Sequence, residues 1–169
     1  WASEPQSVAI APEGLAAWMT AFRTVQGIEI WEEHSKWIEE VQPVFADDID
    51  GRFRWASTLC REESAEAFAL KQTVRERLDQ LLGSEGLLLL PTATGPAPHL
   101  HIGGEANEQR RSQTMQLSSI AGLSGLPQVT LPAGMIDGAP VGLSVIAGRG
   151  QDLRLLDWVQ AAMRSRSLI

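Results

Sequence analysis

The stretch that most constrains the fold runs from a helix end rich in small side chains into two short apolar segments. Residues 116–134 end that helix, turn at a Gly-Leu-Pro sequence, and continue as an apolar segment that stops at Pro-Ala-Gly. A second apolar segment follows soon after. Short apolar runs bounded by glycine and proline are typical of strands. We therefore predict a helix over 107–121 and strands near 128–131 and 140–147.

Helical patterns dominate the first half of the chain. Apolar residues recur at helical spacing from Leu15 to Val25, after a Pro-Glu-Gly start that suits a helix beginning. Gly27 is expected to break or bend this helix, which resumes over 28–41. Residues 62–82 contain no glycine or proline and carry one apolar stripe, which predicts a long helix.

The remaining elements are shorter. Three aspartates at 47–50 precede a helical stretch over 53–59, and we expect their carboxylates to cap it. Four leucines at 87–90 predict a strand that is covered on both faces. Residues 93–106 read as a long loop, and 152–164 as a closing helix. Long irregular loops in compact domains are often functional.

The order of these elements predicts the fold class. Helices, strand, helix, strand, strand and helix favour an α/β fold, although the helical front also fits α+β. We expect residues 1–169 to be one unit, with 1–83 mainly helical and 84–169 arranged as strand-helix-strand-strand-helix. Three strands of central-strand composition indicate part of a larger sheet. The chain is therefore expected to be incomplete on its own, and to self-associate through exposed edges and apolar surface.

Charge and composition exclude several classes of partner. The net charge of −7 argues against a nucleic-acid binder and gives no reason to expect binding to an anionic membrane. No apolar run approaches the about 18 residues of a membrane span. The single cysteine excludes an internal disulfide and suits a reducing cytoplasm. Because the chain begins at Trp1 without a leader pattern, we expect a processed or truncated piece.

Candidate metal and cofactor motifs are weak. His99 and His101 form a two-residue set without further ligands nearby, so a solvated loop is the preferred interpretation. Asp48 and Asp50 resemble a calcium loop, but the acidic residues needed at the other ligand positions are missing. The turn at 148–150 lacks the third glycine of a dinucleotide-binding motif. We expect no metal and no cofactor.

Candidate nucleophiles also lack partners. Ser118, Ser119 and Ser124 have no assignable base, and the Gly-x-Ser-x-Gly elbow is absent. Packing at a helix end is the preferred interpretation of these serines. Cys60 likewise has no assignable base and is expected to be an inert thiol.

Most of the chain nevertheless resembles the carboxy-terminal half of the amidase signature family. The resemblance begins near Phe22 and rests on the buried leucine strand with Pro91-Thr92, the Pro-Ala-Pro loop that starts at Pro96, and the strand pair over 121–134 and 140–147. Two segments depart from the family pattern. Gln128 replaces a small residue after Gly-Leu-Pro, and Leu143-Ser144-Val145 stands in place of a common glutamine pattern. With its Glu-Glu-His-Ser-Lys-Trp-Ile segment at 32–38, the chain is most similar to plant indole-acetamide-type amidases and their bacterial relatives.

The resemblance implies a fold and an activity. It implies the C-terminal part of an α/β/α fold with a mixed sheet and flanking helices, from an enzyme that hydrolyses a small carboxamide through an acyl-serine. The family's Ser-cisSer-Lys triad lies in motifs that this chain lacks, so the chain alone is expected to be inactive. It implies a substrate-pocket wall, for which the candidate residues are Thr92, Thr94, Pro96, Leu123 and Ser124, although each also suits a simple turn.

Two other functions stay open. In the first, the chain is a non-catalytic binding or scaffold module on an amidase-like fold. In the second, it is a subunit that completes its site with a partner chain. The expected partners are a small amide substrate and the missing N-terminal half of the protein.

Overall fold

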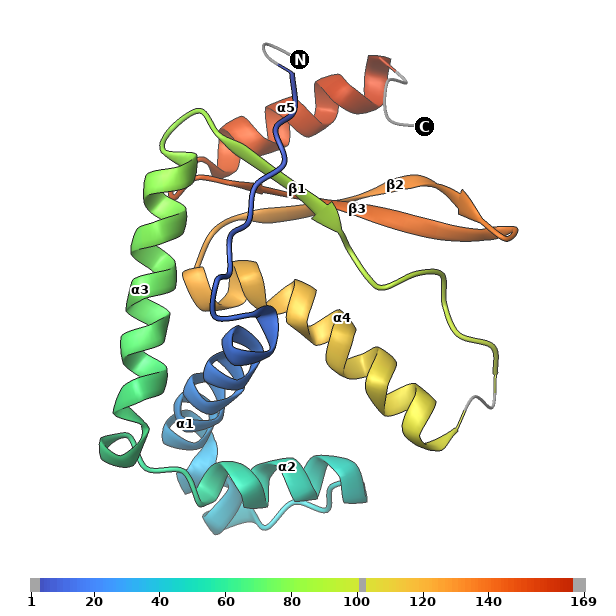
Figure 1. The fold of residues 1–169 in the computed structure, drawn as a ribbon. Coiled ribbons are helices and arrows are strands. Elements are labelled where there is room, and N and C mark those ends of the chain that lie inside the picture. The colour runs from blue at the N-terminus through green and yellow to red at the C-terminus, as the bar shows by residue number, and fades with distance from the viewer. Residues whose placement is uncertain (1–3, 101–102, 166–169) are drawn as a thin grey trace.

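The computed structural model describes residues 4–100 and 103–165, and it places a small sheet between two layers of helices. The strands are β1 (Leu87–Pro91), β2 (Gln128–Ile136) and β3 (Ala139–Ala147), in the order β1-β3-β2. One face carries α5 (Asp152–Ser165), and the other faces α1, α3 and α4 (Figure 1). The bounds of the remaining elements are α1 (Leu15–Val41), α2 (Asp47–Ser57), η1 (Glu62–Ser64), α3 (Ala65–Leu82) and α4 (Gly104–Ser124).

This arrangement confirms the α/β class. Both strand pairs are antiparallel, so the expected mixed sheet is represented in the described residues by antiparallel pairs alone. No described strand pairs with the outer edge of β1. Among the described helices, none is both long and apolar enough to cross a membrane.

Alternation along the strands explains the two layers. Leu88 and Leu90 of β1 pack with Ile146 of β3 into the core formed by α1, α3 and α4. Their neighbours Leu87 and Leu89 pack on the opposite face, around Leu155 of α5. Successive side chains of a strand point to opposite faces, so a strand that is apolar at every position can fill both cores. The expectation that this leucine strand is covered on both faces is correct.

The predicted break in the first helix is wrong. Helix α1 runs without interruption through Gly27, which is buried. A Cβ atom at this position would lie 2.7 Å from Leu59 and 2.8 Å from Trp55. The glycine therefore serves packing: it lets the end of α2 approach the middle of α1.

The aspartates before the second helix do not cap it as expected. Helix α2 begins at Asp47, earlier than predicted, and its N-cap residue, Ala46, makes no side-chain cap hydrogen bond. Asp48 and Asp50 lie inside the first turn, where they pair with Arg52 at 3.7 Å and Arg54 at 2.7 Å. Carboxylates in the first turn still favour the helix because its amino end carries partial positive charge.

An ion pair holds the N-terminal segment against α3. Arg77 of α3 donates to both carboxylate oxygens of Glu13, at 2.7 and 2.9 Å, and to the carbonyl of Ile10 at 3.3 Å. The indole N–H of Trp18 donates to the same carboxylate at 3.2 Å. The hydrogen bonds from Arg77 are the main cause that lowers the pKa of Glu13 to about 2.

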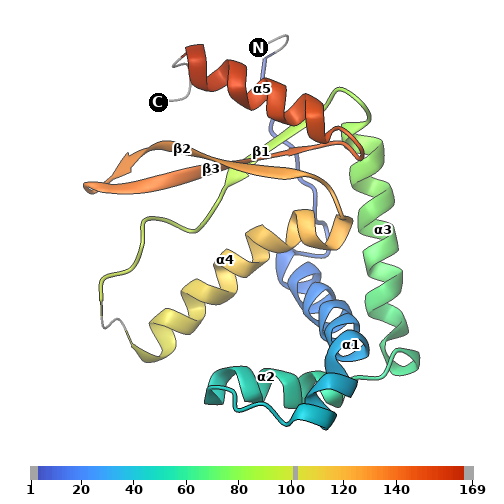
Figure 2. The same cartoon turned by 180° about the vertical axis from the view of Figure 1, so that it is seen from behind.

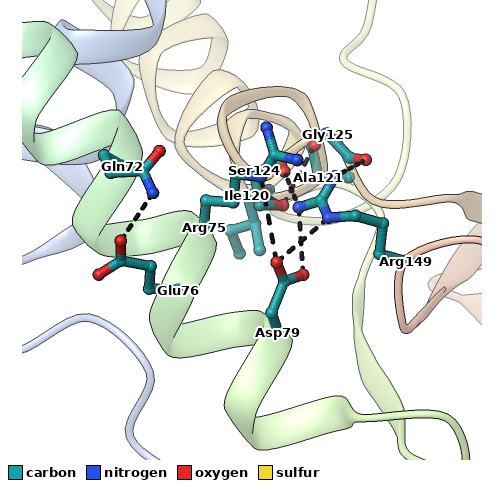
Figure 3. A network of polar contacts seen from close by, with 9 residues as sticks. All are labelled: Gln72, Arg75, Glu76, Asp79, Ile120, Ala121, Ser124, Gly125 and Arg149. Atoms are coloured by element: carbon teal, nitrogen blue, oxygen red, sulfur yellow. Dashed lines mark hydrogen bonds and ion pairs between the residues drawn. The ribbon is translucent and has the colours of Figure 1, made fainter.

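Arg149 holds the C-terminal end of α4 in place (Figure 3). Its guanidinium donates to the carbonyls of Ser124 at 2.7 Å and Gly125 at 3.1 Å. The same group pairs with both carboxylate oxygens of Asp79 on α3, each at 3.1 Å. The last carbonyls of a helix lack intrahelical partners, and a cation placed there satisfies them. The turn after β3 therefore ties α3 to α4.

Candidate functional site

A groove of about 340 Å³ opens between α1, α2 and α4, at the end of the helical layer remote from the sheet. In Figure 2 α2 lies across the lower end of this layer, below α1 and α4. The volume falls within the usual range for small-molecule pockets, about 300–1,000 Å³. Each of the three helices contributes both apolar and polar side chains. We take this groove as the candidate site.

The apolar part of the groove is aromatic and sulfur-rich. Trp55 and Phe53 of α2 face Met19 and Ile30 of α1 and Met115 of α4. Trp55 is 38% exposed and Ile30 36% exposed, which is high for such large side chains. Phe53 is anchored by the ring of Phe45, whose centroid lies 4.8 Å away. The wall is therefore available to an apolar ligand.

The polar part of the groove is dominated by guanidinium groups. Arg23 lies over the ring of Trp55, 5.4 Å from its centroid, which is a cation–π arrangement. Arg111 pairs with Glu108 one turn earlier on α4, at 3.0 Å. Arg52 approaches Asp48 at 3.7 Å. Ser112 donates its hydroxyl to the sulfur of Met19 at 3.7 Å, which links α4 to α1.

None of the residues predicted to line a pocket lines this groove. Thr92 and Thr94 follow β1, and Pro96 lies farther along the same loop. Leu123 and Ser124 are only 1% and 2% exposed, in the core at the end of α4. The Ser124 hydroxyl donates to the carbonyl of Ile120 at 2.7 Å. That these five residues line a substrate pocket stays a prediction.

The other candidate nucleophiles are also engaged locally. Ser118 and Ser119 donate to helix carbonyls three residues earlier, at 3.2 and 3.0 Å. The Cys60 thiol donates to Glu62 at 2.9 Å, and this bond is the main cause that lowers the pKa of Glu62. The serine contacts agree with packing at a helix end, and in the described residues no nitrogen base is hydrogen-bonded to any of the four groups.

The described residues show no metal site at His99 and no parallel βαβ unit at the turn over 148–150. His99 is exposed, and His101 lies outside the described residues. Within 4–100 and 103–165 no group of three or more His, Cys, Asp or Glu is placed to hold a metal. The turn at 148–150 follows a strand that is antiparallel to both neighbours. A dinucleotide-binding turn instead belongs to a parallel βαβ unit.

The two segments predicted to depart from the family pattern contact each other. The side-chain amide of Gln128 on β2 donates to the hydroxyl of Ser144 on β3 at 2.9 Å. Thr92 and Thr130 lie 2.9 and 3.2 Å from the same oxygen. Ser144 is fully buried and forms the centre of this hydroxyl cluster. A long amide on β2 thus meets a small side chain on β3.

Sequence reasoning missed the groove residues, although their spacing carried a signal. Met19, Arg23, Gln26 and Ile30 recur at helical spacing on α1, and Glu108, Ser112 and Met115 do so on α4. Such mixed stripes show which residues share one helix face. They do not show that two other helices approach that face, so the groove emerges only from the packing.

Comparison with known proteins identifies the family that the chain matches. The amidase family model matches residues 7–156. The chain is 36% identical over 147 residues to Amidase 1 of Arabidopsis thaliana, which covers 87% of this chain and 35% of that protein. It is 32% identical to Translocon at the outer membrane of chloroplasts 64 of Pisum sativum, over 80% of this chain and 23% of that protein.

Solved structures agree with the sequence relatives. A crystal structure of an amidase superposes with a TM-score of 0.74 at 25% identity, over 94% of this chain and 38% of that one. The chain thus spans about a third of the length of the amidases that it matches. Because the family model covers nearly the whole chain, and a solved amidase shares its fold, the chain belongs to the amidase family.

Proposed function

We propose that this chain is the C-terminal part of an amidase that hydrolyses a small carboxamide to an acid and ammonia. The observation that carries this proposal is the family match over 7–156, in a chain that corresponds to 35% of Amidase 1. The bond-breaking groups are then supplied by a part of the protein outside this sequence. Such a division agrees with the serines of α4, whose hydroxyls are bonded to helix carbonyls.

The proposed reaction proceeds through an acyl-serine. A serine outside this chain attacks the amide carbonyl, the amine leaves with a proton, and water then hydrolyses the ester. This chain contributes the groove between α1, α2 and α4 as one wall of the substrate site. Its aromatic and sulfur-containing side chains favour an amide with an apolar acyl group.

Ammonia release tests the proposal directly. We expect the 169-residue chain to release no ammonia from phenylacetamide. The longer protein to which it belongs is expected to release ammonia from the same compound. Supplying the upstream part as a separate chain is expected to restore activity if the two parts assemble. Ammonia release by the 169-residue chain alone, abolished by replacing Ser118, Ser119 or Ser124, contradicts the proposal.

A second function is a non-catalytic binding or scaffold module. The match at 32% identity to a protein named for the outer-membrane translocon of chloroplasts favours it. The discriminating observation is the upstream sequence. A lysine followed by a glycine- and serine-rich signature supports the enzyme, and the lack of both supports the module.

We further propose a cytoplasmic location, with a small amide as ligand and no nucleic-acid or membrane partner. The net charge of −7 and the single cysteine support this proposal. Fractionation of cells that express the longer protein tests the location, and recovery in a membrane pellet contradicts it.

A further inference from the structure

Positive charge gathers in the groove of an otherwise acidic chain. Three guanidinium groups, from Arg23, Arg52 and Arg111, line the groove, against the single carboxylate of Glu108. The whole chain carries a net charge of −7. A concave surface lined by one sign of charge attracts ligands of the opposite sign.

Two of these guanidinium groups retain donors for a ligand. Arg23 makes no ion pair with any carboxylate of the described residues, and its contact is the face of Trp55 at 5.4 Å. Arg52 lies 3.7 Å from Asp48, which is beyond ordinary hydrogen-bond distance, and its side chain is 57% exposed. Arg111, in contrast, is bonded to Glu108 at 3.0 Å. The fork of a guanidinium matches the geometry of a carboxylate.

The apolar surface lies directly beside these donors. The ring of Trp55 underlies Arg23, and Phe53 and Met115 extend the apolar surface within the same groove. A volume of about 340 Å³ accommodates a ring and a short side chain. The groove thus presents an apolar face and an unpaired cation side by side.

We propose that the groove binds an aromatic monocarboxylate, with the carboxylate on Arg23 and the ring against Trp55. Glu108 reduces the positive charge of the groove, which favours a single carboxylate over a polyphosphate. This inference rests on the proposed function in one respect: it names the substrate as an apolar amide that carries a free carboxylate away from the amide to be cleaved.

Phenylacetate and phenylacetamide are matched probes, because they share their shape and differ in charge. Binding to the 169-residue chain is measured by calorimetry and by the shift of the indole N–H signal of Trp55. We expect phenylacetate to bind about tenfold more tightly than phenylacetamide. Arg23→Gln is expected to abolish this preference, and Arg23→Lys to retain part of it, because lysine keeps the charge without the fork.

The matched control is Arg54→Gln. Arg54 lies on α2, beside Trp55, but is 81% exposed, pairs with Asp50 and does not line the groove. We expect this variant to keep the full preference for phenylacetate. Equal binding of the two probes to the unaltered chain overturns the proposal, and so does an Arg23→Gln variant that keeps the preference while its circular dichroism spectrum is unchanged.

Hydrolysis by the longer protein separates this inference from the proposed function. Cleavage of neutral amides in preference to carboxylate-bearing ones leaves the proposed function standing and overturns the inference. Lack of hydrolysis for any amide contradicts the proposed function, while the binding preference of the groove is still decided by the two probes.

Discussion

At the scale of single residues, one buried hydroxyl joins three polar side chains of the sheet. Ser144 is fully buried and lies within 3.2 Å of Gln128, Thr92 and Thr130. A hydroxyl can donate once and accept twice, so this one oxygen can hydrogen-bond to all three neighbours. The contact between Gln128 and Ser144 joins the two segments that were predicted to depart from the family pattern.

Ser144→Ala is expected to destabilise the fold by about 0.5–1.5 kcal/mol, because three half-buried or exposed polar side chains lose a hydroxyl that they share. Urea unfolding measures the loss. Ser118→Ala is the control, since that hydroxyl is exposed and bonds only to the carbonyl of Met115. A Gln128→Ala/Ser144→Ala double variant is expected to lose less than the sum of the single changes. Strict additivity would show that the amide and the hydroxyl are not coupled.

The Glu13–Arg77 pair predicts a pH dependence. Hydrogen bonding to Arg77 lowers the pKa of Glu13 from its ordinary value of 4.5 to about 2 in the folded protein. A lowered folded pKa contributes stability that is present above pH 4.5 and is lost as the pH falls toward 2. Glu13→Gln is expected to flatten the stability profile in that window. Urea unfolding at several pH values tests this, with the exposed Glu39→Gln as control. If Glu13→Gln leaves the slope of stability against pH unchanged between pH 4.5 and 2, the pair is not the source of the pH dependence.

At the scale of elements, close backbone approaches determine how the helices and turns meet. Gly27 lets α2 pack on the middle of α1, and Gly148 lets the turn after β3 contact the turn after α3. A Cβ atom at Gly148 would collide with the carbonyl oxygen of Gly83. Backbone cannot rotate away as a side-chain tip can, so the contact tolerates only glycine. Arg149 next to it then reaches Asp79 and the end of α4.

Gly148→Ala is therefore expected to destabilise the fold by about 2–3 kcal/mol, as overpacking of a rigid contact does. Gly51→Ala is the matched change: that glycine lies within α2 and a Cβ atom there meets nothing within 4 Å. It is expected to stabilise by about 0.5–1 kcal/mol, because alanine is the better helix former. Thermal and urea unfolding measure both the loss of stability at Gly148 and the gain at Gly51. Equal effects at the two positions would rule out the backbone contact as the cause.

At the scale of the whole molecule, the sheet has edges at which no described strand pairs. The outer edge of β1 has no partner strand, and large apolar side chains are exposed elsewhere, including Leu153 at 78% and Met135 at 63%. Unpaired edges and exposed apolar surface favour association. These features agree with a chain that spans about a third of its relatives.

The chain alone is expected to self-associate as its concentration rises. Sedimentation velocity over a dilution series measures this, and replacing Leu153 and Leu156 on the exposed side of α5 by lysine tests the contribution of that surface. Both side chains are more than half exposed, so the fold is expected to tolerate the change. A monodisperse monomer at every concentration contradicts the prediction.

Much of the fold follows from local sequence, whereas the candidate site does not. The 3.6-residue period of 65–82 and the apolar strand at 87–91 depend on neighbours along the chain, and both were predicted nearly to their ends. The missed continuation of α1 through Gly27 depends on its contact with Trp55 and Leu59. The bounds of α2 and α4 were also missed, since both helices begin earlier than predicted. The five predicted pocket residues came from the family resemblance, and they lie apart from the groove in the described residues.

The sequence by itself determined the element types, the two-faced strand and the family, because these follow from periodicity and from short motifs read along the chain. Only the tertiary structure decided which side chains meet: Ser112 reaches Met19, and Arg23 lies over Trp55. The physical reason is distance along the chain. A helix face is set by residues one turn apart, whereas the groove needs three helices brought together by packing that no local pattern encodes.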